Sequence, residues 1–106
     1  MIQKLCCAVL IMLNLHIVTA QSTQVISGVV IDKATLQPIQ FADVMILNSA
    51  PVIATLSDSS GIFRFSSIPV GRYGIKVSFI GYHEHIVGEV LVVAGKQTQL
   101  IIQLEE

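Results

Sequence analysis

The sequence predicts an all-β fold, a seven-stranded antiparallel sandwich of two sheets. Apolar and polar residues alternate with a period of two along several short segments, as expected for strands that are buried on one side. Turn-forming residues separate these segments at intervals of roughly ten residues. After the first twenty residues, no segment shows the apolar period of a helix.

Residues 1–20 are predicted to be a signal peptide. Lys4 supplies the positive charge, an apolar run extends from Leu5 to Leu15, and Val18-Thr19-Ala20 offers the small residues that a signal peptidase accepts. The alternative is a retained membrane anchor, but the run is shorter than the roughly 20 residues that a membrane span needs. We therefore expect cleavage and export, and no direct membrane span after cleavage.

The mature domain is expected to comprise residues 21–106, beginning at Gln21. Cys6 and Cys7 leave with the signal peptide, so no disulfide supports the domain and its β-core must stabilise it alone. Without Lys4, five basic and seven acidic side chains remain, scattered along the chain. This charge distribution gives no electrostatic support for binding nucleic acid.

The stretch from Ser57 to Tyr82 is the part around which the prediction is built, because two alternating strands and two turns follow one another in it. Asp58 can accept a hydrogen bond from the backbone two residues on, and Gly61 can take the positive φ that such a turn requires. Pro69 presets φ in the next turn, which ends at Gly71. These turns predict successive antiparallel hairpins.

Five further strands are expected around this stretch, over residues 25–31, 39–47, 52–56, 83–93 and 98–104. Residues 32–38 end the first of them, because Asp32 opens a turn and Pro38 cannot donate a hydrogen bond to a sheet ladder. Gly88 predicts a bulge or break in the long strand 83–93. The residues expected on the core faces are Ile26, Gly28, Val30, Ala42, Val44, Ile46, Phe63, Phe65, Tyr73, Ile75, Val77, Phe79, Leu100, Ile102 and Leu104.

Tyr73 and Tyr82 are predicted to be core aromatics whose hydroxyl groups reach a polar partner at the rim of the core. Gly81, just before Tyr82, marks a predicted bend. Met45 and Leu47 lie on the face opposite the core, which predicts that this face is partly covered as well.

Five motifs resemble the carboxypeptidase regulatory-like domain, in the same order and at similar spacing over residues 24–104. They are I-S-G-V-V-I-D (26–32), P-I-Q-F-A-D-V (38–44), S-D-S-S-G-I-F-R-F (57–65), I-P-V-G-R-Y (68–73) and S-F-I-G-Y (78–82). The resemblance implies a transthyretin-like, Greek-key β-sandwich. The residues that match the motifs and carry a structural role are Gly28, Asp32, Pro38, Ala42, Asp58, Gly61, Phe63, Pro69, Gly71, Tyr73, Gly81 and Tyr82.

One departure from the family pattern is informative: Phe41 stands where many members carry a small residue. That variant is similar to the domain at the N-terminus of TonB-dependent outer-membrane receptors of Bacteroidetes-type bacteria. There a plug and barrel follow the domain, whereas this sequence ends at Glu106. The resemblance therefore implies a truncated or split receptor, or a stand-alone copy of the module.

The possible chemical sites each have a structural alternative. His83 and His85 share a strand face and could bind a metal ion with a third ligand, but Glu84 is expected to point away, so solvent-facing histidines are predicted. Asp58 lacks the spacing of a calcium loop and is read as a turn former. No serine lies in a nucleophile motif. Lys33 and Asn48 would be the pair for an internal isopeptide crosslink, but Lys33 falls in a turn.

No catalytic residue, metal site or cofactor is therefore predicted. The preferred function is a non-catalytic accessory domain on the periplasmic side of a TonB-dependent receptor, with a cell-envelope protein, the plug and barrel or a TonB-system component, as partner. Strands 52–56 and 83–93 are the expected free edges for such a contact. The alternative is an exported module that binds carbohydrate or peptide. Because the chain has no Trp and its aromatics fall on predicted core faces, the first function is favoured.

Overall fold

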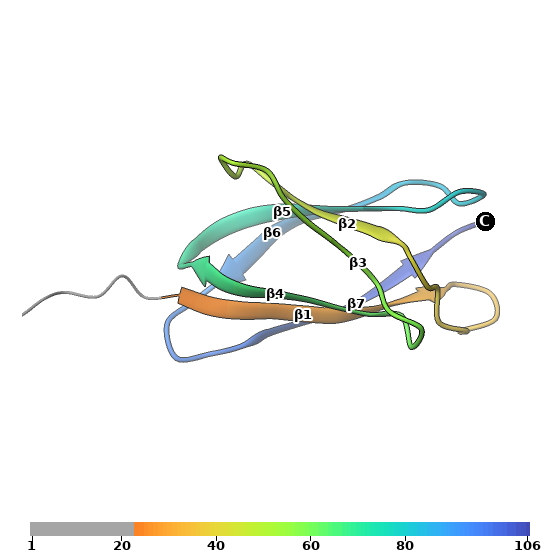
Figure 1. The fold of residues 1–106 in the computed structure, drawn as a ribbon, viewed down its shortest axis with the longest axis horizontal. Helices are drawn as coiled ribbons and strands as arrows, with labels where there is room; N and C mark the ends of the chain where they lie inside the picture. The colour runs from red at the N-terminus through yellow and green to blue at the C-terminus, as the bar shows by residue number, and fades with distance from the viewer. Residues whose placement is uncertain (1–22) are drawn as a thin grey trace, which may run out of the picture.

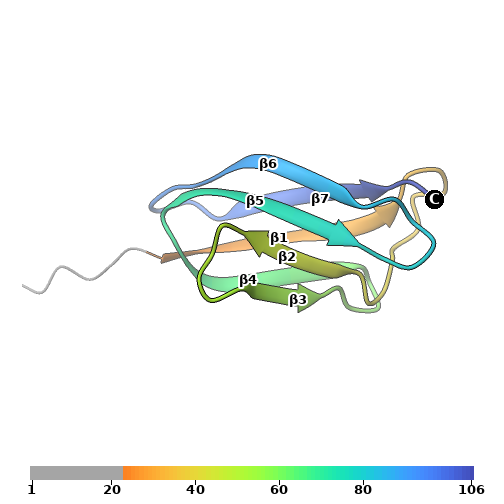
Figure 2. The ribbon, with the colours of Figure 1, turned by 90° about the horizontal axis from the view of Figure 1, so that it is seen from above.

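The computed structural model describes residues 23–106, and within this range it contains seven strands and no helix (Figure 1). The strands are β1 (Thr23–Asp32), β2 (Asp43–Leu47), β3 (Ile53–Leu56), β4 (Ile62–Pro69), β5 (Gly71–Ser78), β6 (His85–Val92) and β7 (Thr98–Leu104). They form a three-stranded sheet in the order β4-β1-β7 and a four-stranded sheet in the order β3-β2-β5-β6. The predicted two-sheet β-sandwich is confirmed, and Figures 1 and 2 show the two layers from the side and from above.

One strand pair departs from the predicted antiparallel arrangement. β1 pairs in parallel with β7, from Ile26 opposite Thr98 to Asp32 opposite Leu104, while every other strand pair in the two sheets is antiparallel. The sequence could not show this, because turn residues fix the relative direction only of strands that follow each other closely. β1 and β7 are instead the first and last strands of the sandwich.

The expectation of successive hairpins is wrong at both turns of the stretch from Ser57 to Tyr82. The Asp58–Gly61 turn carries the chain from β3 in the four-stranded sheet to β4 in the three-stranded sheet, and the Pro69–Gly71 turn carries it back to β5 in the four-stranded sheet. Only β2–β3 and β5–β6 are neighbours both in sequence and within a sheet. Alternation did not reveal these crossings, because the core-facing residues of the strands point inward in either arrangement.

The core lies between the two sheets and matches the prediction closely. Its fully buried apolar residues include Ile26, Val30, Ala42, Val44, Ile46, Phe63, Phe65, Ile75, Val77, Ile102 and Leu104. Tyr73, Phe79 and Leu100 are partly buried and pack against them. The rings of Phe63 and Phe65 meet edge to face, with their centroids 6.1 Å apart.

Gly28 is the position where the core needs the absence of a side chain. A Cβ placed there would collide with the carbonyl oxygen of Leu100 on β7 and would lie 2.7 Å from Cζ of Phe63. The ring of Phe63 therefore packs directly over the backbone of β1. This explains in physical terms why a glycine occupies a core-facing position of that strand.

The bulge predicted near Gly88 is confirmed. Tyr73 pairs with Val90 and Ile75 pairs with Val87, so Gly88 and Glu89 together oppose the single residue Gly74. The residue with positive φ is Glu89, at 58°, rather than the glycine. A second bulge lies in β4, where Ser67 has a φ of 60° and the register with β1 shifts.

Among residues 23–106, no helix is long and apolar enough to cross a membrane. The predicted signal peptide, residues 1–20, lies outside the described part of the chain and remains a prediction.

Candidate interaction site

Asp32 and Tyr82 form a polar contact at one end of the sandwich. Oδ1 of Asp32 accepts hydrogen bonds from the backbone N–H groups of Ala34 and Thr35, at 2.8 and 2.9 Å. The hydroxyl of Tyr82 donates to Oδ2 of Asp32 at 2.6 Å. The contact thus joins the turn after β1 to the turn after β5, across the two sheets.

The electrostatics of this contact follow from its geometry. The hydrogen bond from Tyr82, together with the backbone N–H of Thr35, holds the pKa of Asp32 below its ordinary value, against the opposing effect of burial. The same hydrogen bond, with burial adding to it, raises the pKa of Tyr82 to about 12. The ionised carboxylate and the neutral phenol therefore persist together over a wide pH range, which suits a structural contact.

The tyrosine prediction is confirmed at both positions. Tyr73 and Tyr82 are partly buried against the core, and the hydroxyl of Tyr73 donates to the carbonyl oxygen of Pro69 at 2.7 Å. The bend predicted just before Tyr82 is also present, with a φ of 88° at Gly81.

The turn at Asp58 has the predicted geometry. Oδ1 of Asp58 accepts hydrogen bonds from the backbone N–H groups of Ser60 and Ile62, each at 2.9 Å. Gly61 adopts a φ of 77° and donates its N–H to the carbonyl oxygen of Asp58 at 2.8 Å. The side chain of Asp58 is thus used to build the turn.

Ser57 has a role that the sequence analysis missed. It is 1% exposed, its Oγ donates to the carbonyl oxygen of Ile39 at 2.6 Å, and the same Oγ accepts the N–H of Ala42 at 2.9 Å. Its backbone N–H donates to Ala42 and its carbonyl accepts from Phe41. The segment before β2 is therefore held by a buried serine, and residues 39–42 are not in strand conformation as predicted.

Phe41 corrects the expectation that all aromatics lie on core faces. It is 61% exposed and adopts a φ of 64°, which a bulky residue takes only when its surroundings impose it. Its N–H bond to Ser57 fixes this conformation. Phe41 lines a shallow hollow of about 380 Å³ with Asp43, Ser78, Phe79 and Ile80, and Ile80 is 93% exposed.

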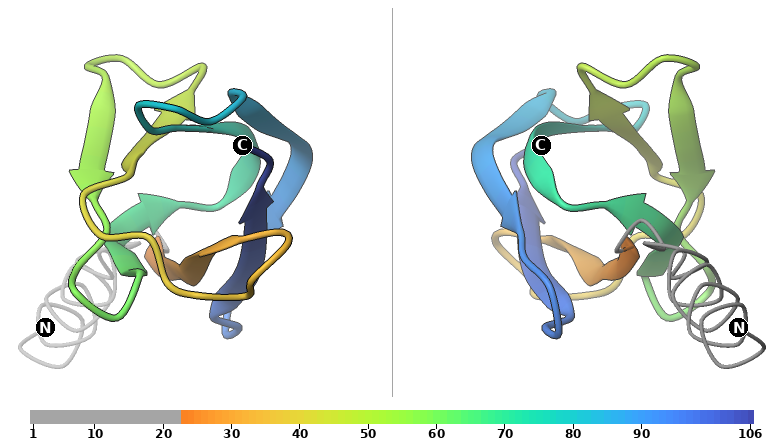
Figure 3. Two further views of the ribbon diagram at one scale, coloured as in Figure 1. Left: turned by 90° about the vertical axis from the view of Figure 1, so that its right-hand side faces the viewer. Right: turned by 90° about the vertical axis from the view of Figure 1, so that its left-hand side faces the viewer.

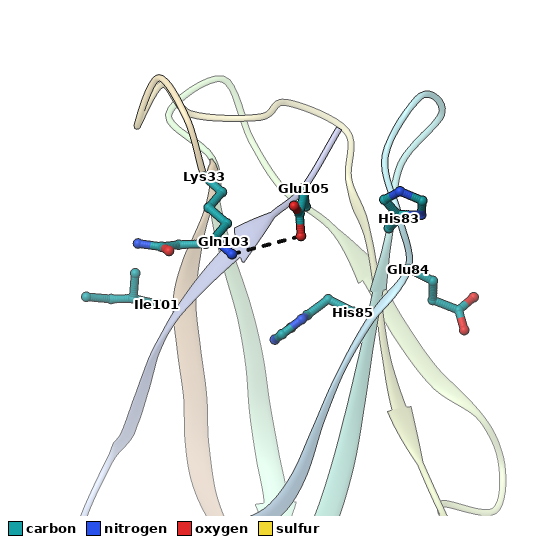
Figure 4. Close-up of a pocket in the computed structure, with 7 residues that line it drawn as sticks. All are labelled: Lys33, His83, Glu84, His85, Ile101, Gln103 and Glu105. Carbon is teal, nitrogen blue, oxygen red and sulfur yellow. Dashed lines mark ion pairs between the residues drawn. The ribbon is translucent and has the colours of Figure 1, made fainter.

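The two histidines lie beside a hollow of about 420 Å³ between β6 and β7 (Figure 4). Its lining residues are Lys33, His83, Glu84, His85, Ile101, Gln103 and Glu105. Both histidines are exposed, and the side chain of Glu84 points away from the other residues, as expected. Among the described residues, no group of three metal-ligating side chains is arranged to hold a metal ion.

Glu105 is a member of this hollow that sequence spacing did not reveal. Its carboxylate lies 3.9 Å from Nζ of Lys33, and its backbone carbonyl accepts the N–H of His83 at 2.7 Å. Residues from the turn after β1, the start of β6 and the end of β7 meet here only because of the fold. Lys33 and Asn48 are both exposed, so they do not form the buried pair that an isopeptide crosslink needs.

The two expected edges are confirmed, because β3 and β6 are the outer strands of the four-stranded sheet. β4 and β7 are the corresponding edges of the three-stranded sheet. The short strand β3 is only four residues long.

The predicted motif residues divide into three groups by position. Gly28, Ala42 and Phe63 belong to the core, while Asp32, Asp58, Gly61, Gly81 and Tyr82 build turns or the contact between them. Pro38, Pro69, Gly71 and Tyr73 lie along the crossings and strand ends, with Pro38 in an isolated bridge to Ile31. The structure does not bring these residues together into one site. They form the frame that holds the edges and hollows in place.

Comparison with known proteins defines the class of the domain. Solved structures with the same fold include a chain of a type II cohesin–X-dockerin complex from Acetivibrio cellulolyticus, with a TM-score of 0.65 and 22% identity over 76% of this chain and 56% of that chain. A putative carbohydrate binding protein from Bacteroides uniformis matches with a TM-score of 0.65 and 11% identity, over 78% of this chain and 41% of that chain. The major pilin subunit of Bacillus cereus matches with a TM-score of 0.61 and 17% identity, over 79% of this chain and 30% of that chain. No curated protein sequence matches significantly.

These likenesses establish the fold, and this chain spans between about a third and just over half of the length of each of those three chains. The family of the chain is identified by its sequence. The profile of the carboxypeptidase regulatory-like domain matches residues 25–105. The chain therefore belongs to the carboxypeptidase regulatory-like domain family.

Proposed function

We propose that this chain is an exported, non-catalytic interaction domain that docks to a protein of the cell envelope, on the periplasmic side of a TonB-dependent outer-membrane receptor. The observation that carries the proposal is the family match over residues 25–105, combined with Phe41 at the position where the receptor-type variant differs. The side-chain oxygens of Asp32, Ser57 and Asp58 form hydrogen bonds with backbone groups or with Tyr82. These bonds hold the turns of the fold, which agrees with a structural role for the three residues.

The solved neighbours support a binding or structural role in general terms. One belongs to a cohesin–dockerin complex and another is a pilin subunit. A sandwich can contribute to such contacts through its unpaired strand edges, since each edge presents free N–H and C=O groups. In this domain four edges are available, two in each sheet.

The genomic sequence around the gene tests the receptor assignment. We expect a reading frame for a plug and barrel directly downstream of the codon for Glu106 or adjacent to it. A neighbourhood that encodes only a secreted hydrolase would contradict the proposal.

Incubation of the purified chain with peptide and ester substrates, with and without zinc, should give no turnover above background. Turnover that disappears in a His83→Ala, His85→Ala variant would refute the non-catalytic assignment.

Carbohydrate binding is the second candidate, and one observation favours it. Phe41 presents an exposed ring beside Ile80, and a sugar ring can stack on such a surface. Calorimetry with a panel of oligosaccharides decides between the two. Micromolar binding that is lost in Phe41→Ala but kept in Leu36→Ala, a change at another exposed apolar residue, would establish the second function and overturn the first.

A further inference from the structure

The outer side of β7 carries backbone groups without a partner in the described structure. The carbonyl of Leu104 accepts the N–H of Lys33, so it points toward β1, while the next carbonyl, that of Glu105, points the other way to His83. Successive residues of a strand direct their N–H and C=O groups to opposite sides. The backbone groups of Gln99, Ile101 and Gln103 therefore point away from β1, and none of them is bonded to β6 within residues 23–106.

β7 is also the most regular of the four edges. β3 is four residues long, and β4 and β6 are each interrupted by a bulge, at Ser67 and Glu89. Bulges and short strands are the usual protection against pairing with another chain. β7 pairs with β1 over seven consecutive residues without a register shift, so this protection is absent there.

The neighbourhood of β7 indicates what kind of partner fits. β6 is tied to β7 at both ends, by the bond from Thr98 Oγ1 to the carbonyl of Leu91 at 3.2 Å and by the bond from His83 to Glu105 at 2.7 Å. The hollow of about 420 Å³ lies at the end near His83 and Glu105 and extends along β7 to Ile101. The views from above and along the sandwich place β6 beside and beyond β7 (Figures 2 and 3). This arrangement favours a single extended chain as the partner, because the edge of a second sandwich would meet β6.

The register of the sheet indicates the side chains of that partner. Val29 on β1 lies opposite Ile62 on β4 and Ile101 on β7, so an apolar row crosses the outer face of the three-stranded sheet and ends at Ile101, which is 74% exposed. A β-branched residue opposite Ile101 would extend this row. Polar residues suit the positions opposite Gln99 and Gln103.

We propose that the seam between β6 and β7, defined by Gln99, Ile101 and Gln103 on β7 and His85 on β6, binds a short extended segment of a partner protein. The segment adds to β7 as a further strand, antiparallel to it, with an apolar residue opposite Ile101. Antiparallel pairing is slightly more stable per residue than parallel pairing. The inference deepens the proposed function, because it rests on docking to protein and names the surface that performs it.

Amide hydrogen exchange of the full chain tests the proposal in two steps. In the free chain, the N–H groups of Gln99, Ile101 and Gln103 should exchange at least tenfold faster than those of Leu100 and Ile102, which are bonded to β1. The peptide acetyl-Thr-Val-Ile-Val-Thr-amide, added at millimolar concentration, should slow the exchange of the three fast amides. The same peptide with an N-methylated central isoleucine should leave them unchanged, because it lacks that donor. Equal exchange along β7 in the free chain, or equal effects of both peptides, would overturn the proposal.

A pair of variants provides a second test. Ile101→Pro removes an N–H that faces the seam while the N–H groups that face β1 belong to other residues, so peptide binding should weaken at least tenfold. Ile101→Thr keeps the N–H and a β-branched side chain, and should bind within about threefold of the parent. If Ile101→Pro does not fold, the comparison of the two peptides alone decides.

Failure of the seam proposal can be distinguished from failure of the proposed function, on which the seam proposal rests. An Ile101→Pro chain that still binds the receptor protein would overturn the seam proposal and leave the docking function standing. Peptide-dependent protection of the three amides, in a chain that binds no envelope protein, would support the seam as a strand acceptor and refute the receptor assignment.

Discussion

At the level of single residues, the contact between Asp32 and Tyr82 shifts the pKa of both partners, and it therefore predicts how stability depends on pH. Because the pKa of Asp32 is lowered in the folded chain, its contribution is present above the ordinary value of 3.8 and is lost as the pH falls below it. Because the pKa of Tyr82 is raised to about 12, its contribution is complete below the unfolded value near 10 and is lost as the pH rises toward 12.

Spectrophotometric titration of the phenols checks this prediction. The parent should show one tyrosine that ionises near pH 12, and this step should be missing in Tyr82→Phe. Denaturation midpoints of the parent and of Tyr82→Phe should lie furthest apart between about pH 5 and 9, and should converge at lower and higher pH. A constant difference between the two chains across the whole range would contradict the assigned contact.

Gly28 gives a second prediction at this scale. Gly28→Ala places a methyl group against the carbonyl of Leu100 and the ring of Phe63, so β1 and β7 must separate or Phe63 must leave its position. We expect the free energy of unfolding to fall by about 1–3 kcal/mol, the usual cost of overpacking a core. Gly88→Ala is the matched control, because a Cβ there meets nothing within 4 Å. Equal stability of Gly28→Ala and the parent, measured in urea, would disprove the close packing of Phe63 on β1.

At the scale of elements, the bulge in β6 holds an unfavourable backbone conformation. Glu89 holds a φ of 58°, a conformation that is unfavourable for a residue with a side chain, and its ion pair with Arg72 at 3.2 Å is exposed and contributes little. Glu89→Gly should therefore keep the fold and raise the free energy of unfolding by up to about 1 kcal/mol.

The control for this prediction is Glu84→Gly, which removes a comparable exposed carboxylate, one that lies 4.0 Å from Lys76. The φ of Glu84 is not positive, so Glu84→Gly relieves no strain. The glycine only makes the unfolded chain more flexible, and the free energy of unfolding should therefore fall. Urea denaturation of both variants measures the difference. If Glu89→Gly is the less stable of the two, the bulge is not a strained feature of β6.

The elements also show what sequence can and cannot predict. Alternation placed Ile26, Val44, Phe63 and Val77 in the core, because a strand that is buried on one side imposes a period of two. Turn chemistry predicted the Asp58 turn, because its hydrogen bonds are local. Neither signal reports which sheet a strand joins, so the crossings from β3 to β4 and from β4 to β5 and the parallel pairing of β1 with β7 could not be predicted.

The candidate site was less predictable than the fold for the same reason. The edges β3 and β6 were recognisable from a short strand and a glycine within a strand. The seam depends on His83 meeting Glu105, more than twenty residues later in the chain, and on the free side of β7. The exposure of Phe41 depends on the buried Ser57, whose role is visible only once residues 39–42 and 57 lie together.

At the scale of the whole molecule, the turns and polar contacts hold two packed sheets together and leave two outer strands in each sheet. Its core holds two sheets of unequal width, three strands against four, so β6 overhangs β7 as seen from above (Figure 2). This inequality creates a sheltered strand edge in a family member that has no disulfide within residues 23–106 to support it. It is this edge that we propose as the surface for one extended chain.

Site-specific photocrosslinking in the native envelope tests the central claim, docking to a TonB-dependent receptor, most directly. A benzoylphenylalanine replaces Gln99, at one end of the seam, or, as the matched control, Arg64 on the opposite edge of the same sheet. We predict that irradiation links the Gln99→benzoylphenylalanine chain to a receptor with a plug and barrel, identified by mass spectrometry, and that the Arg64 position gives several-fold less of this product. Absence of any receptor from the products at both positions would contradict the account.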